Sequence, residues 1–286
     1  MPVRGSSTVR QLRLGAELRK LRERAGLTST AAGRLLGTNQ AQISNIEASR
    51  FGVSADRVRA LAHNYSCCDE ALINGLISMT GERKRGWWEE YRDILPASLL
   101  DLAELEHHAT ALRAAYVAHL PGLLQTAEHA REIFRQVVPP LSPPEVEHRV
   151  SHRIKRQAVL YRSDPTPYTA IIHEAALRMR FGGPSTSLQQ LEHIIKMSDC
   201  DHVTVLVIPF DADSFPGSGQ SILYAAGPVT QLDTVHLDTE HGSEFLDAAA
   251  QLEKYRVVLD RMEAVALPEG ASRDLIQNIA QSLKGE

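Results

Sequence analysis

The stretch GTNQAQISNIEASR, residues 37–50, has the pattern of a short helix with a strongly polar surface. Asn39 is a good N-cap residue, and no proline interrupts the residues that follow it. Ile43 and Ile46 lie three residues apart and therefore share one face. The stretch predicts a helix over residues 39–48 with both isoleucines buried.

The side of this helix away from the isoleucines carries Gln40, Ala41, Gln42 and Asn45. Long amide side chains at a helix N-terminus match the paired donor and acceptor edge that adenine presents in the major groove of DNA. A solvated surface helix is the alternative interpretation. The flanking sequence has to decide between the two.

Length and composition indicate an ordinary globular protein. The chain has 286 residues, of which 43% are hydrophobic and 23% charged, enough for one small and one larger domain. It contains no run of about 18 apolar residues and no apolar N-terminal leader, so we expect a cytoplasmic protein that does not enter a membrane.

The three cysteines, two of them adjacent as Cys67 and Cys68, are too few for a secreted disulfide framework. No Cys-x-x-Cys or His-x-x-x-His spacing indicates zinc, and we expect no metal and no cofactor. A redox role for the adjacent pair is the alternative to buried free thiols.

The net charge of −4 conceals an asymmetry along the chain. Residues 1–66 hold eleven Lys or Arg against four acids, and residues 67–286 hold twenty against thirty-one. A basic segment of this size fits a polyanion, which the acidic remainder would repel. Contact with nucleic acid is therefore expected in the N-terminal part.

Apolar stripes predict five short helices in this N-terminal part. The predicted inward positions are Leu14, Leu18, Leu21 and Ala25; Ala31, Ala32, Leu35 and Leu36; Ile43 and Ile46; Val58, Leu61, Ala62 and Tyr65; and Leu72, Ile73, Leu76 and Met79. Gly37 separates the second helix from the third, and two short helices joined by such a turn form a helix-turn-helix.

The run LGAELRKLRERAGLTSTAAGRLLGTNQAQISNIEASR, residues 14–50, resembles the DNA-binding domain of the Xre, or Cro/C1-type, regulators. The resemblance covers about residues 10–65, and both helices and the turn fall in register. It implies that the helix at 39–48 enters the major groove, that Gln42 reads a base directly, and that Glu47 fixes the turn or pairs with an arginine. The implied DNA contacts are Thr38, Asn39, Gln40, Ala41, Gln42, Ser44, Asn45, Arg50, Arg13 and Lys20, with the basic residues on phosphates.

The polar segment TGERKRG marks a linker at 80–86, so the predicted domains are 1–79 and 87–286. The second domain is predicted as α+β with a small sheet, which makes the fold mainly α overall. Predicted helices cover 87–134 with a break at Pro121-Gly122, 144–161, 187–198, 243–263 and 272–284; predicted strands cover 169–173, 203–209, 221–225 and 229–237, with a hairpin turn at Gly217-Ser218-Gly219.

Several blocks of this second domain resemble the effector domain of the WhiJ-like, antitoxin-like regulators. They are LPGLLQTAEHARE at 120–132, HRIKRQAVLYR at 152–162, HEAALRMRFGGPSTSLQQLEHI at 173–194, VTVLVIPFDADSF at 203–215 and AVALPEGASRDLI at 264–276. The resemblance implies a transcription factor. It leaves open whether the large domain binds a small partner protein, a small-molecule effector or a second copy of itself.

An enzyme is the competing class of function. The pairs His173-Glu174 and Asp201-His202 carry acid–base and metal-binding groups, but no nucleophile elbow, zinc helix or phosphate loop accompanies them. We therefore expect no catalysis. Trp87, Trp88 and Tyr91 are interpreted as core residues, with a ligand pocket as the alternative.

The sequence thus predicts a sequence-specific transcriptional regulator that binds double-stranded DNA. An antitoxin-like protein that neutralises a small partner and regulates its own gene is the alternative. A homodimer is expected because one recognition helix reads few base pairs, with stripes at 101–118 (Leu102, Leu105, Ala109, Leu112) and 243–263 (Phe245, Ala249, Leu252, Tyr255, Leu259) as candidate contacts unless they are core.

Overall fold

The computed structural model describes residues 7–80, 86–239 and 241–284, so most of the predicted linker lies outside the described residues. The chain divides into two compact units. One contains the residues up to Glu89 together with Gly227–Leu232, and the other contains the rest. The predicted fold class, a helical N-terminal bundle followed by a larger α+β domain, is confirmed.

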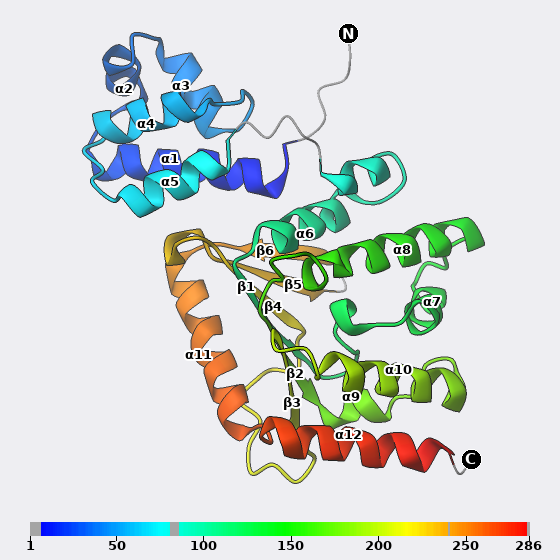
Figure 1. The fold of residues 1–286 in the computed structure, drawn as a ribbon. Coiled ribbons are helices and arrows are strands. Elements are labelled where there is room, and N and C mark those ends of the chain that lie inside the picture. Colours follow the sequence, from blue (N-terminus) through cyan, green and yellow to red (C-terminus); the bar gives the residue numbers. More distant parts are fainter. Residues whose placement is uncertain (1–6, 81–85, 240, 285–286) are drawn as a thin grey trace. The chain divides into compact units, whose positions relative to one another are not determined.

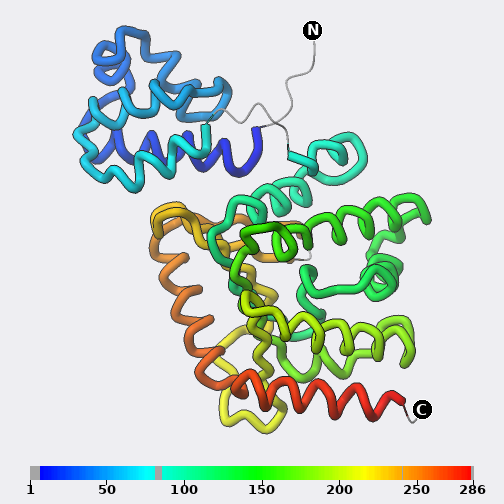
Figure 2. The backbone as a smooth tube through the Cα atoms, in the orientation of Figure 1, coloured from blue at the N-terminus to red at the C-terminus, as the bar shows by residue number. Residues whose placement is uncertain are grey.

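The N-terminal bundle consists of α1 (Val9–Arg24), α2 (Ser29–Leu35), α3 (Gln40–Glu47), α4 (Ala55–Asn64) and α5 (Glu70–Ser78) (Figures 1 and 2). Each helix begins at a side chain that accepts a backbone N–H of the first turn. These caps are Thr8, Thr28, Asn39, Ser54 and Asp69. Such caps satisfy amide groups that a helix leaves unpaired, which is why the helix starts were readable from sequence.

The predicted stripes meet in one core, which includes Leu14, Leu18, Leu21, Ala32, Ile43, Ile46, Val58, Leu61, Tyr65, Leu72 and Leu76. The inward prediction is wrong for Leu35, whose side chain is 55% exposed. Its neighbour Leu36 packs against the core instead, because α2 ends at Leu35 and adjacent helical residues point in different directions.

Glycines allow the three helices around the predicted turn to approach closely. A Cβ atom on Gly15 of α1 would lie 2.5 Å from the Glu47 carbonyl oxygen, and one on Gly33 of α2 would lie 2.9 Å from the Asn39 carbonyl carbon. Larger side chains at these two positions would push α3 away from its neighbours. On α2 the residue that permits this close approach is thus Gly33. It lies next to Ala32, which was predicted to point inward and is buried.

The C-terminal unit is built on a six-stranded sheet of order β3-β2-β1-β4-β5-β6. The strands are β1 (Ala111–Tyr116), β2 (Tyr168–His173), β3 (Val203–Ile208), β4 (Ile222–Ala226), β5 (Thr234–Thr239) and β6 (Gly242–Leu246). β1, β2 and β3 run parallel, whereas β4, β5 and β6 continue the sheet antiparallel.

Helices cover both faces of this sheet (Figure 1). The remaining elements are η1 (Trp87–Tyr91), α6 (Ala97–His108), η2 (Gly122–Leu124), α7 (Ala127–Arg135), α8 (Pro143–Arg156), η3 (Gln157–Leu160), α9 (Glu174–Arg178), α10 (Gly183–Met197), η4 (Thr230–Leu232), α11 (Ala249–Val265) and α12 (Glu269–Lys284). One face packs against α6, α10 and α12, and the other against α11. α7 and α8 pack together through Ala130, Phe134, Val146 and Val150.

Three local predictions in this domain are wrong. Residues 111–116 form β1 and residues 242–246 form β6, although both were predicted as helix. β1 pairs with β2 on one side and β4 on the other, and this pairing overrides the helix propensity of its Ala and Leu residues. Gly217-Ser218-Gly219 is not a hairpin turn, because β3 and β4 are not neighbours in the sheet.

The two stripes that were candidates for a dimer contact are largely core. Leu102, Ala109 and Leu112 lie in the cluster on one face of the sheet, and Leu252 and Leu259 lie in the cluster on the other. A dimer would have to use other surfaces. Among the described residues, no helix has the length and apolar character needed to cross a bilayer.

Candidate nucleic-acid interface

The helix α3 presents its polar side to solvent because its apolar side is fully occupied. Ile43 is 1% exposed and Ile46 is 3% exposed. The Asn39 side chain accepts a hydrogen bond from the Gln42 amide at 2.9 Å and fixes the first turn. On the other side, Gln40 and Ala41 are exposed, whereas Gln42, Ser44 and Asn45 are half-buried; of the two preceding residues, Asn39 is exposed and Thr38 half-buried.

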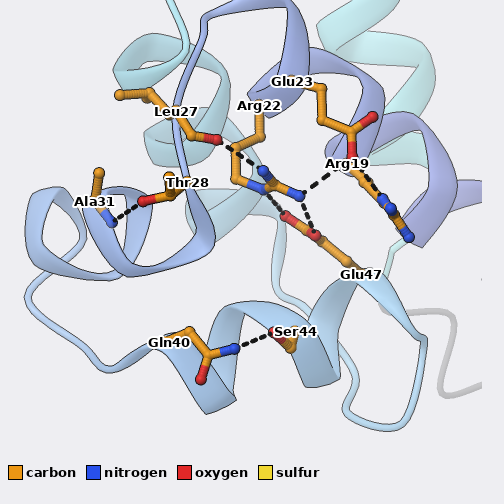
Figure 3. A network of polar contacts seen from close by, with 9 residues as sticks. All are labelled: Arg19, Arg22, Glu23, Leu27, Thr28, Ala31, Gln40, Ser44 and Glu47. Carbon is orange, nitrogen blue, oxygen red and sulfur yellow. Dashed lines mark hydrogen bonds and ion pairs between the residues drawn. The ribbon is translucent and has the colours of Figure 1, made fainter.

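The far end of α3 is held by an ion pair with α1 (Figure 3). Arg22 donates to both carboxylate oxygens of Glu47, from Nε at 2.6 Å and from Nη2 at 2.9 Å, and its Nη1 donates to the Leu27 carbonyl at 2.7 Å. The hydrogen bond to Glu47 raises the pKa of Arg22. The predicted pairing of Glu47 with an arginine is confirmed, and it fixes α3 against α1.

Two side-chain contacts organise the polar face of α3. Thr38 Oγ1 donates a hydrogen bond to the Gln42 amide oxygen. Gln40 Nε2 donates to Ser44 Oγ at 3.2 Å, as Figure 3 shows. Gln42 is therefore held at the start of the helix by its oxygen. The amide oxygen has a second lone pair, so it can accept from the adenine amino group in a two-point contact while the Thr38 hydroxyl stays bound.

The basic residues of this unit differ in how accessible they are. Arg24, Arg34 and Arg50 are exposed and form no ion pair with any residue in the described ranges. Arg24 and Arg34 were not predicted as contacts. The signal that would have found them is the absence of an acid three or four positions away on their helices.

Arg13 and Lys20 share one acidic partner. Arg13 is 6% exposed, and its Nε lies 3.2 Å from Glu17 Oε1. Lys20 Nζ lies 2.7 Å from the same oxygen, with its side chain 39% exposed. The burial of Arg13 does not fit the predicted phosphate contact, because such a contact needs an accessible guanidinium. Lys20 keeps part of its surface accessible.

In the pairs His173-Glu174 and Asp201-His202, three of the four side chains have local hydrogen-bond partners. His173 Nδ1 accepts from the Ala175 amide at 3.2 Å, Glu174 accepts from the Phe210 amide at 2.8 Å, and His202 Nε2 lies 2.8 Å from the Leu160 carbonyl. Trp88 and Tyr91 are buried, as the core interpretation predicts. No group of three His, Cys, Asp or Glu side chains suited to a metal ion occurs in the part of the chain that the structure describes.

The sequence matches the helix-turn-helix domain family over residues 13–74, the range that holds α2, α3, α4 and most of α1 and α5. Residues 99–278, more than half of the chain, match the family described as domain of unknown function (DUF5753). The chain belongs to the DUF5753 family. The DUF5753 match begins in α6 and ends in α12, so it covers the whole six-stranded sheet. Neither a curated protein nor a solved structure matches the chain significantly.

Proposed function

We propose that this protein is a sequence-specific transcriptional regulator of the Xre, or Cro/C1, type that places α3 in the major groove of its operator. The observation that carries the proposal is the row of amides on the outer side of α3, exposed at Gln40 and half-buried at Gln42 and Asn45. The opposite side of the helix is fixed by two buried isoleucines and by the ion pair between Arg22 and Glu47. A rigid helix with a polar outer face is suited to reading base edges. The helix-turn-helix match supports DNA binding.

The residues of the interface divide into two roles. Gln42 and Asn45, with Gln40 at the start of the helix, make base contacts, and Arg50 contacts the phosphate backbone. Arg34 joins the phosphate contacts because it is exposed and has no ion pair among the described residues. Lys20 contributes weakly because Glu17 already neutralises much of its charge.

The C-terminal domain acts as a WhiJ-like effector domain with no catalytic activity, in a cytoplasmic protein. It dimerises the regulator and senses a small molecule. Dimerisation places two copies of α3 about 34 Å apart on a near-palindromic site and supplies the affinity that one short helix lacks. Since the candidate stripes are core, the dimer contact uses an exposed surface of this domain.

Selection of DNA fragments bound by the purified full chain tests the function. The expected result is one enriched motif with two half-sites about one helical turn apart, protected in footprinting. Retention of random fragments with no shared motif would contradict sequence-specific regulation.

Sedimentation of the full chain without DNA tests the dimer separately. A dimer at micromolar concentration is expected. A monomer that also binds the enriched site with one half-site protected would overturn the dimer while leaving DNA reading intact.

A further inference from the structure

A group of basic side chains belongs to the C-terminal domain, on the side of the sheet that carries α7, α8 and α10, the helices labelled in Figure 1. Its members range from buried His129 and His236 through half-buried Arg153 to exposed His119. Arg153 of α8 and His129 of α7 are its central members. His119, which follows β1, and His236 of β5 border it. We call these four residues the basic cluster. They come from the loop after β1, from α7, from α8 and from β5.

Arg153 is a cation with no carboxylate partner. Its Nη1 donates to the amide oxygen of Gln125, and its Cζ lies 4.7 Å from the centroid of the Phe134 ring. Within the described residues it forms no ion pair, and its Nε has no hydrogen-bond partner. Glu106 of α6 is already paired with Arg156 through two hydrogen bonds of 2.6 and 2.7 Å. Burial lowers the pKa of Arg153 to about 10.

His129 is 1% exposed, and neither of its ring nitrogens has a hydrogen-bond partner among the described residues. Burial, followed by the charges of His119 and Arg153, lowers its pKa to about 4, so the ring is neutral at physiological pH. A neutral imidazole has one N–H donor and one acceptor, and leaving both unpaired in the interior is costly. Stability does not explain a buried histidine with two unpaired ring nitrogens, so its presence calls for a functional explanation.

The wall beside His129 is aromatic. The Phe181 ring lies edge-on to His129 with centroids 5.7 Å apart, and it stacks on His119 at 5.2 Å with an interplanar angle of 29°. Arg153 bonds Gln125 and lies over the Phe134 ring, on either side of His129 along the chain, so its guanidinium lies beside the segment that carries His129. A flat, partly apolar surface therefore adjoins an uncompensated positive charge.

The fourth member of the basic cluster lies on the sheet itself. His236 of β5 pairs in register with Leu223 of β4, which belongs to the core on this face, so His236 lies on the same face. It is 6% exposed, and its Nε2 has no partner in the described parts of the chain. Asp238, two residues further along β5, is exposed and raises the pKa of His119 and Arg153 without forming an ion pair.

Three buried glutamines hold residues 120–125, the segment that leads through η2 to the start of α7. Gln125 donates to the Leu120 carbonyl at 2.7 Å, Gln157 to the Gln125 carbonyl at 2.6 Å, and Gln190 to the Leu124 carbonyl at 2.7 Å. Each of these hydrogen bonds satisfies a backbone carbonyl that would otherwise be unpaired, and it fixes the position of that carbonyl. The segment is thus preorganised around Arg153 and His129, which favours binding over a merely tolerated polar interior.

We propose that the basic cluster binds a small organic anion, with its carboxylate or phosphate group against Arg153 and His129 and its flat part against Phe181. This gives the ligand class for the sensing role, and to that extent it rests on the proposed function. The guanidinium supplies the charge and a free N–H, and the His129 N–H supplies a second donor. A metal ion does not fit, since the described residues hold no suitable group of three ligands.

Calorimetry on the full chain with sodium benzoate, phenyl phosphate and inorganic phosphate, at constant ionic strength set with chloride, tests the proposal. Saturable binding of at least one of these probes at one site per chain is expected. Benzoate alone would assign a carboxylate ligand, and phenyl phosphate or phosphate would assign a phosphate. Arg153→Gln should weaken this binding about tenfold or more, as loss of a charged hydrogen bond implies.

Two variants separate a binding role from a structural one. His129→Leu, of similar volume, should weaken probe binding yet leave the melting temperature without probe unchanged or higher, because two unpaired buried atoms are removed. Arg135→Gln removes the same charge from an exposed position on α7 and should leave binding unchanged. No saturable binding of any probe, or equal weakening by Arg153→Gln and Arg135→Gln, would overturn the proposal.

These measurements use no DNA, so their outcome is independent of the regulator proposal. If a probe binds the basic cluster, its effect on affinity for the selected operator shows whether the site is coupled to DNA binding. Probe binding with no operator found would sustain the anion site and refute the regulator. Detection of an operator without binding of any probe would sustain the regulator and refute the anion site.

Discussion

Arg22 on the last turns of α1 holds Glu47 at the end of α3 in a two-point ion pair, with both side chains about one-tenth exposed. A pair this buried fixes orientation more than it adds stability, because two charges had to leave water to form it. Its consequence is geometric, because α3 cannot rotate on the bundle without breaking this pair.

Removal of one partner should therefore destabilise the bundle. Glu47→Gln leaves the buried Arg22 with only the longer, 3.6 Å contact to the half-exposed Glu23, and we expect a loss of about 3 kcal/mol. Replacing both residues by Met should restore much of it, because neither charge remains. Hydrogen exchange of the α1 and α3 amides in the full chain measures the change. A double variant as unstable as Glu47→Gln would contradict this account.

The close approach of α1 to α3 gives a second prediction. In Gly15→Ala the new Cβ would lie 2.5 Å from the Glu47 carbonyl oxygen and 2.7 Å from Ser49 Oγ, so α3 must shift. A destabilisation of about 1–3 kcal/mol and a loss of DNA affinity are expected. Gly52→Ala is the matched control, since its Cβ meets no atom within 4 Å. Equal effects of the two variants would show that the close contact is unimportant.

The arginines of the interface should appear in the salt dependence of DNA binding. Affinity falls by about 0.9 log unit per log unit of salt for each phosphate neutralised, so Arg50→Ala or Arg34→Ala should reduce the slope by about one. Arg131→Ala, which breaks an ion pair with Glu147 on the C-terminal domain, should not change it. An unchanged slope for Arg50→Ala would remove that residue from the phosphate contacts.

Acid should destabilise the C-terminal domain through its buried histidines. The folded pKa of His129 is about 4, below its usual 6.5, so the unfolded chain binds the proton first. The contribution of the neutral His129 ring to the free energy of unfolding is complete above pH 6.5 and is lost as pH falls to about 4. The pKa difference corresponds to about 3 kcal/mol. Urea unfolding at about pH 7 and about pH 4 should show a smaller difference for His129→Leu than for the native chain. An identical difference would contradict the burial of a neutral ring.

The N-terminal bundle was predictable because its determinants are local. Asn39 caps its own helix, and Ile43 and Ile46 lie three residues apart, so the residues that fix the structure lie within one segment. In the C-terminal domain the determinants are distant. Residues 111–116 are a strand only because β2 and β4 pair with them.

The two candidate sites also differ in whether their determinants are local or distant in the sequence. The polar face of α3 could be predicted from one segment, although the burial of Arg13 and its contact with Glu17 could not. The basic cluster has no motif, because His119, His129, Arg153 and His236 come from a loop, two helices and a strand that only the folded domain brings to one side of the sheet. Spacing along the chain contains no information about such a group.

The most direct test of the central claim, that α3 reads DNA sequence, compares Gln42→Ala with the native chain on the selected operator and on random DNA of equal length. We predict a loss of about 1–3 kcal/mol on the operator and little change on random DNA, whereas Arg50→Ala weakens both alike. Equal losses on both DNAs for Gln42→Ala, or no loss on either, would contradict base reading by α3.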